Sequence, residues 1–130
     1  MIDHISISVQ SISECRDFYF GVMKTLGIEF IGEDEQWLGF GLRANEDHPE
    51  RVYLSIFSSP DWKKDNKLHW CFKASSREEV DAFHKTGLLL GGRDGGTPGL
   101  RKHYHRNYYA SFIDDPCGNR LEAVCHLNEI

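Results

Sequence analysis

The chain lacks long hydrophobic runs, an excess of positive charge and paired cysteine motifs, and each absence narrows its function. No window reaches about 18 apolar residues, so no membrane span is expected. A net charge of −5 disfavours a general nucleic-acid-binding protein. The four cysteines form no C-x-x-C motif, so we interpret them as reduced and mostly structural. No basic and apolar leader opens the chain, so we expect a cytoplasmic protein.

What the chain does contain is an internal repeat. The shared markers are His4, Ser11, Glu14 and Phe18 in the first copy and His69, Ser76, Glu79 and Phe83 in the second. Each marker of the second copy follows its counterpart by 65 residues. A repeat of this length indicates a duplicated supersecondary unit. Each copy opens with a strand that carries one histidine, so two facing copies would bring two histidines to one place.

The first copy predicts the element order β-α-β-β-β. Residues 2–9 alternate between apolar and polar side chains, which is typical of a half-buried strand. Ser11 and Glu14 then have the spacing of a capping box at the start of a helix. Gly27 stands where a helix ends in the left-handed conformation. Short strands are expected at 28–31, 37–42 and 51–57.

The second copy predicts the same order. A strand at 68–74 precedes a helix that Ser76 and Glu79 cap, and another strand is expected near 88–90. Residues 91–99 contain five glycines in nine positions, which predicts a loop. Strands at 108–113 and 120–127 then form a hairpin around DDPCGN.

These elements predict an α+β fold with one domain over residues 1–130. Module one covers about 1–58 and module two about 66–127. The two tandem β-α-β-β-β modules are expected to form a curled mixed sheet around a shared cleft.

Three side chains are candidate metal ligands: His4, His69 and Glu122. Each lies on the strand face opposite the apolar residues that a helix must cover, so all three should project into the cleft. Two imidazoles and one carboxylate form a facial triad that suits divalent Zn, Ni, Mn, Co or Fe. Each residue alone has a simpler explanation as an ordinary strand residue. The repeat of the two histidine strands and the shared orientation of all three side chains together favour a metal site.

The whole sequence resembles the vicinal oxygen chelate superfamily, which includes glyoxalase I, fosfomycin-modifying thiol transferases, extradiol dioxygenases and bleomycin-resistance proteins. The resemblance rests on DHISISV, LHWCFKA and the closing DPCGNRLEAV. It implies that His4, His69 and Glu122 bind a metal, and that the protein is a homodimer whose cleft comes from one chain or from two. Small glyoxalase I enzymes have a fourth ligand, a glutamate, where this chain has Ser55. Weak or absent glyoxalase I activity is therefore expected.

The expected function is a glyoxalase-like metalloenzyme of the lyase, isomerase or thiol-transferase type. Its substrate would be a small molecule with two neighbouring oxygens that the metal holds as a Lewis acid. Tyr109 and His105 are expected to contact this substrate, because HYHRNYY leads into a strand of the cleft. Tyr53 and His126 are further candidates for proton transfer, each with a plain packing or solvent-exposed alternative.

Two alternative functions stay open. A two-histidine, one-carboxylate site also fits an Fe(II) extradiol dioxygenase. A protein of this family can instead sequester an aromatic or antibiotic-like ligand without chemistry.

Overall fold

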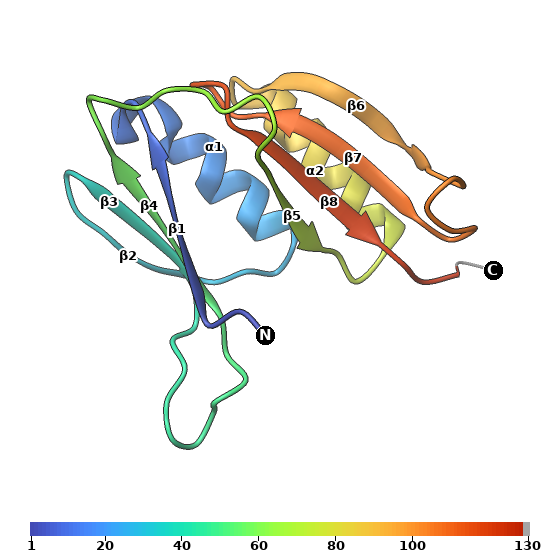
Figure 1. The fold of residues 1–130 in the computed structure, drawn as a ribbon, viewed down its shortest axis with the longest axis horizontal. Coiled ribbons are helices and arrows are strands. Elements are labelled where there is room, and N and C mark those ends of the chain that lie inside the picture. Colours follow the sequence, from blue (N-terminus) through green and yellow to red (C-terminus); the bar gives the residue numbers. More distant parts are fainter. Residues whose placement is uncertain (129–130) are drawn as a thin grey trace.

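The computed structural model describes residues 1–128; residues 129 and 130, the last two of the expected domain, lie outside this part. Module one contains β1 (His4–Val9), α1 (Ile12–Thr25), β2 (Phe30–Glu33), β3 (Trp37–Gly41) and β4 (Tyr53–Ser58). Module two contains β5 (His69–Lys73), α2 (Arg77–Leu89), β6 (Arg93–Leu100), β7 (Tyr109–Asp114) and β8 (Arg120–Cys125) (Figure 1). The α+β class and the repeated β-α-β-β-β order are confirmed.

Each module forms its own four-stranded mixed sheet. The strand orders are β1-β4-β3-β2 and β5-β8-β7-β6. In both sheets the first strand of the module runs parallel to the last, and the other pairs are antiparallel. The expected sheet is thus divided in two, with β1 and β5 as edge strands that pair only within their own modules among the described residues. Such edges leave a row of backbone groups available to another chain.

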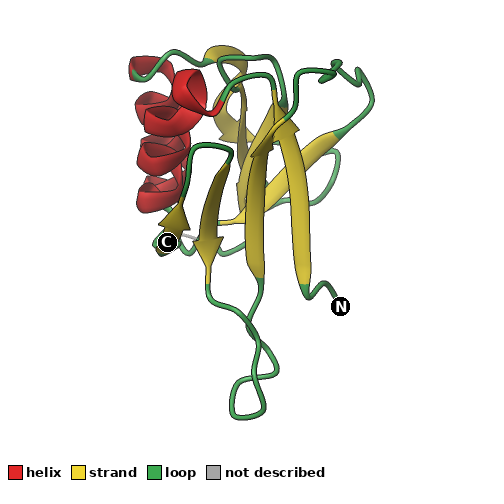
Figure 2. Cartoon of the chain, turned by 90° about the vertical axis from the view of Figure 1, so that its left-hand side faces the viewer, coloured by secondary structure: helices red, strands yellow, loops and turns green. Residues whose placement is uncertain are grey.

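The two helices lie on one side of the sheets and pack against each other (Figure 2). One continuous core joins both modules and includes Phe18 and Tyr19 of α1 and Phe83 of α2, all fully buried. Gly87 lets α2 approach its sheet closely, because a Cβ atom there would lie 2.3 Å from Cδ1 of Ile113. Neither described helix is long and apolar enough to cross a membrane.

The two helix starts differ, although their sequences predict the same cap. Ser76 caps α2 as expected, since its side chain accepts the backbone N–H of Glu79 at 3.1 Å. Ser11 makes no such bond. At the start of α1 the backbone N–H of Ile12 instead donates to the hydroxyl of Ser58, at 2.9 Å. The capping box predicted at Ser11 was wrong, because a side chain from β4 supplies the acceptor.

The glycine-rich segment 91–99 is not the predicted loop. Most of it belongs to β6, which pairs with β7 through an irregular register, and residues 88–89 end α2 rather than form a strand. Side chains from neighbouring positions lie over the glycines: a Cβ atom at Gly96 would be 3.1 Å from Phe112, and one at Gly95 would be 3.0 Å from Arg120. Tertiary pairing therefore overrides the poor strand propensity of glycine.

Candidate metal site

A histidine and a buried glutamate meet on the face of the second sheet that points away from α2. Glu122 on β8 is 2% exposed, and its Oε1 lies 3.0 Å from Nε2 of His69 on the adjacent parallel strand β5. The alternation along both strands sends Leu121 and Ala123 toward the helix and Glu122 away from it. Two side chains of the types that bind divalent metals thus lie together.

Tyr108 forms a hydrogen bond with the Glu122 carboxylate. Its hydroxyl donates to Oε2 of Glu122 at 2.5 Å. Burial, followed by the hydrogen bond to Glu122, raises the pKa of the Tyr108 hydroxyl. Burial and the neighbouring Glu122 raise the pKa of Cys71, which is paired with Glu122 across the strands, to about 12. Tyr108 therefore stays a proton donor, and Cys71 is a neutral thiol rather than a thiolate.

Two exposed histidines extend from Tyr108 toward the surface. Nε2 of His105 lies 2.9 Å from Nδ1 of His126. Both rings meet the ring of Tyr108 edge-on, with centroid separations of 5.5 Å for His105 and 5.3 Å for His126. His105 is one of the two residues that the sequence predicted to contact substrate. It contacts Tyr108, which in turn contacts Glu122 of the His69–Glu122 pair.

Tyr109, the other residue predicted to contact substrate, lies on the opposite face of β7. Its hydroxyl donates to Asp81 of α2 at 2.6 Å, and the guanidinium of Arg77 lies 5.1 Å from its ring. Consecutive residues of a strand point to opposite faces. Because Tyr109 packs against α2, Tyr108 points to the other face and contacts Glu122. In the structure Tyr109 pairs with the buried Cys125 across the strands, and no local sequence signal reveals this register.

His4 stands on β1, in the first sheet. Its ring stacks on Tyr53 of β4, with centroids 4.9 Å apart and planes at 10°. Nδ1 of His4 lies 2.5 Å from Oδ1 of Asp3. Ser55 is on the same face one pair further along β4, where it is opposite Ser6 and 5% exposed. Asp3 was not predicted from the sequence.

The three predicted ligands do not form one compact group within a single chain. Among residues 1–128, three ligand atoms within 4.8 Å of one another occur in Cys15, Asp115 and Cys117 alone. His69 and Glu122 meet, and His4 is held on the other sheet. Within one chain, His69 and Glu122 therefore lie together, and His4 lies apart from them on the other sheet.

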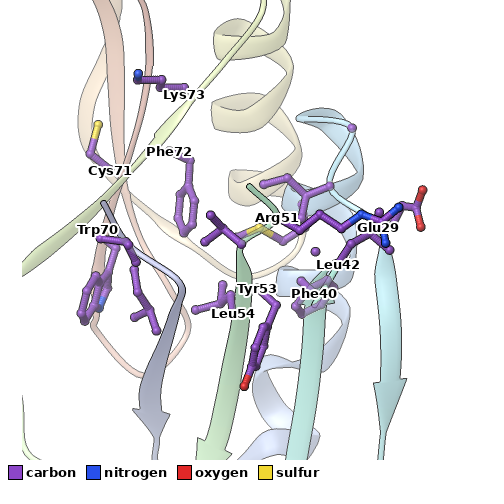
Figure 3. Close-up of a pocket in the computed structure, with 17 residues that line it drawn as sticks. Glu29, Phe40, Leu42, Arg51, Tyr53, Leu54, Trp70, Cys71, Phe72 and Lys73 are labelled. Carbon is purple, nitrogen blue, oxygen red and sulfur yellow. The ribbon is translucent and has the colours of Figure 1, made fainter. Parts of the chain in front are cut away.

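An apolar cleft of about 600 Å³ opens between the two modules (Figure 3). Phe72 of β5 points toward Leu54 and Phe40 of the first sheet, Trp70 also lines the cleft, and Cys71 points away from the first sheet. Trp70 and Phe72 lie on the face of β5 opposite His69, and the cleft also borders Cys71 and Lys73 at this edge strand. Its apolar lining suits a hydrophobic or aromatic molecule.

Comparison with known proteins agrees with this architecture. The family model described as "Glyoxalase/Bleomycin resistance protein/Dioxygenase superfamily" matches residues 1–123. A glyoxalase/bleomycin resistance protein from Albidiferax ferrireducens T118 is 25% identical, with a TM-score of 0.77 over 96% of this chain and 98% of that chain. A glyoxalase/bleomycin resistance protein/dioxygenase family enzyme from Burkholderia phytofirmans PsJN is 15% identical, with a TM-score of 0.70 over 96% of this chain and 98% of that chain.

A third solved structure, a glyoxalase-related enzyme from Fulvimarina pelagi, is 11% identical, with a TM-score of 0.68 over 96% of this chain and 87% of that chain. No curated protein matches the sequence. The family match covers nearly all of the described residues, and the solved structures share both modules. The chain belongs to the glyoxalase/bleomycin resistance protein/dioxygenase superfamily.

Proposed function

We propose that this protein is a divalent-metal-dependent enzyme of the glyoxalase-like type, with His69 and Glu122 of one copy and His4 of a second copy as the metal ligands. The observation that carries the proposal is the buried Glu122 facing His69 at 3.0 Å. A buried carboxylate is costly unless an opposite charge compensates it. A divalent cation would supply that charge at the open face of the sheet.

The surroundings of His4 support its role as the third ligand. Metal-binding histidines commonly donate their other ring N–H to a carboxylate, which fixes the tautomer and the ring orientation. Asp3 is placed to accept from Nδ1 of His4, which leaves Nε2 for the metal. Stacking on Tyr53 further restricts the ring.

The proposed second copy follows from the unpaired edge strands. β1 carries His4, β5 carries His69, and each is an edge of its own sheet. A twofold dimer could place β1 of each copy beside β5 of the other copy. This arrangement would cover all four of these edge strands and form two identical sites.

When bound, the ion would supply Lewis-acid stabilisation of charge on two neighbouring substrate oxygens. The chain's own residues would orient the site and move protons. Tyr108 holds Oε2 of Glu122 and remains protonated. His105 and His126, in contact with each other and with Tyr108, would exchange protons between the site and solvent. Tyr109, which is engaged with Asp81 on the other face, has no part in this proposal.

A subunit-mixing experiment tests the shared site. His4→Ala and Glu122→Ala proteins each lack one ligand, so each alone should lose tight binding of Mn²⁺ or Ni²⁺. A mixed dimer would contain one intact site, made from His4 of the Glu122→Ala copy and His69 with Glu122 of the His4→Ala copy. After subunit exchange in an equal mixture, we expect about a quarter of the wild-type sites to return, as counted by isothermal titration calorimetry on metal-free protein.

Each variant taken alone through the same exchange is the control, and light scattering confirms that the variants remain dimeric. If wild-type protein binds the ion tightly and the mixture recovers no sites, each chain builds its own site and the shared arrangement is wrong. Wild-type protein that takes up no divalent ion would contradict the metal site itself.

Activity assays then distinguish a glyoxalase-type isomerase from a dioxygenase. We expect weak or no turnover of methylglyoxal with glutathione, because Ser55 replaces the fourth carboxylate. Oxygen consumption with catechols under Fe(II) would instead identify a dioxygenase. Loss of any observed activity on chelation, and its return with added metal, is expected in either case.

The apolar cleft between the modules favours one second candidate, a small-molecule binding protein. Trp70 lines this cleft, so binding of an aromatic ligand such as anilinonaphthalene sulfonate should quench its fluorescence. If His4→Ala leaves that affinity unchanged and no metal binds to the wild type, the binding function is preferred. A ligand whose affinity depends on the metal would favour the enzyme.

A further inference from the structure

Two cysteines from different modules lie together, away from the proposed metal site. Cys15 belongs to α1, and Cys117 lies in the turn between β7 and β8. Their sulfur atoms and a carboxylate oxygen of Asp115 all lie within 4.8 Å of one another. Such a cluster can in principle hold a metal or undergo thiol chemistry.

The carboxylate of Asp115 is not available to a metal. Oδ1 accepts the backbone N–H groups of Cys117, Gly118 and Asn119, at 2.8–2.9 Å. Oδ2 accepts the hydroxyl of Tyr19 and the side-chain amide of Asn119. These five donors use the acceptor positions that a carboxylate offers. Asp115 therefore organises the turn, and the two sulfurs are the groups left for chemistry.

The two thiols are unequal in a way that suits sequential oxidation. Cys15 is fully buried, whereas Cys117 is partly exposed on the turn. The hydrogen bond from Cys15, helped by the backbone N–H of Gln10, lowers the pKa of Cys117. The same pairing with Cys117, together with burial, raises the pKa of Cys15. A partly exposed cysteine with a lowered pKa beside a buried partner is the arrangement found in cysteine-based redox sensors.

We propose that Cys117 and Cys15 are a nucleophilic and resolving pair that closes an intramolecular disulfide when the protein meets hydrogen peroxide. The Cys117 thiolate attacks the peroxide, so that its sulfur gains one oxygen as a sulfenic acid and hydroxide leaves. The Cys15 thiol then attacks that sulfur, a disulfide forms, and water leaves with the released proton. Two thiols are oxidised by two electrons in total, and one peroxide is reduced to two waters.

The disulfide would join the modules at a point where they already meet. Asn119, in the same turn, donates to the backbone oxygen of Ser8 at the end of β1, at 2.8 Å. It also accepts from the indole of Trp62 in the linker between modules, at 3.2 Å. A bond from α1 to this turn would therefore fix the position of one module on the other and resist unfolding of either.

The test is oxidation of the folded wild-type protein with a small excess of hydrogen peroxide in the presence of a chelator. Peptide mapping without reductant should find Cys15 linked to Cys117, while Cys71 and Cys125 stay outside this link. The melting temperature should rise by several degrees after oxidation and return with dithiothreitol. The rate should increase with pH through the lowered pKa of Cys117, because the thiolate is the attacking form.

Two variants separate the roles of the sulfurs. Cys15→Ser should accumulate a sulfenic acid at Cys117 that dimedone traps, and Cys117→Ser should neither form the link nor change its melting temperature with peroxide. The Cys71→Ser variant should form the same Cys15–Cys117 link as the wild type. Peptide maps in which Cys117 of the wild type stays reduced, or pairs with Cys71 or with another molecule, would overturn the proposal even if the Cys15 variant fails to fold.

Discussion

Ser55 is the residue at which the resemblance to small glyoxalase I enzymes predicts a difference in the proposed metal site. It lies on β4, on the same face as His4, and its neighbours across the sheet are the small residues Ser6 and Gly39. A serine hydroxyl is a weak ligand for a divalent ion, whereas a carboxylate is a strong one. In the structure Ser55 lies on the same sheet face as His4, as alternation along the paired strands requires.

In the proposed metal site, replacing Ser55 by glutamate should therefore create a fourth ligand. Removing a residue that only hydrogen-bonds to a metal ligand lowers metal affinity about 10–100-fold. A direct carboxylate ligand should matter at least as much, so Ser55→Glu should raise the affinity for Ni²⁺ by about tenfold or more. Titration calorimetry on metal-free protein measures this change. Ser55→Gln has nearly the same shape without the charge and serves as the control; equal affinities for both variants would show that position 55 does not face the ion.

At the scale of helices, the same Ser-x-x-Glu spacing is followed by different caps. The Ser-x-x-Glu pattern predicts a cap at both starts, but only Ser76 accepts a backbone N–H in the structure. The start of α1 depends on Ser58, which is 46 residues further along the chain. A cap supplied by another element cannot be recognised from the helix sequence itself.

Ser76→Ala should accordingly lower the free energy of unfolding by about 1 kcal/mol, because it removes the acceptor for an N–H at the helix start. Ser58→Ala should have an effect of the same size, for the same reason. Ser11→Ala should change stability much less, since within residues 1–128 the Ser11 hydroxyl forms a hydrogen bond only with the hydroxyl of Ser13. Urea unfolding followed by circular dichroism gives all three values, and a large loss for Ser11→Ala would contradict the assigned caps.

At the scale of the whole molecule, the turn between β7 and β8 holds the two modules together. Its buried Asp115 accepts from Tyr19 of α1 and from backbone groups of the turn. The D-P-C-G-N sequence predicted this turn, but nothing local indicated that its aspartate would bind a tyrosine 96 residues earlier in the chain.

Asp115→Ala should lower the free energy of unfolding by about 3 kcal/mol or more, because several buried donors lose their acceptor at once. Tyr19→Phe removes one donor and leaves Asp115 with its other partners, so the loss should be about 1 kcal/mol. Equilibrium unfolding in urea compares the two variants. Similar losses for both would mean that the tyrosine contact, rather than the organisation of the turn, dominates this junction.

The sequence by itself determined the repeat, the element order and the face of each strand on which His4, His69 and Glu122 lie. These features depend on local periodicity, which acts over a few residues and is duplicated in the chain. Only the tertiary structure decided that residues 93–100 pair as β6, that Tyr108 rather than Tyr109 meets Glu122, and that Cys15 lies beside Cys117. Those outcomes depend on strand register and on packing between modules, where residues distant in the chain supply the hydrogen-bond acceptors and the covering side chains that local composition does not reveal.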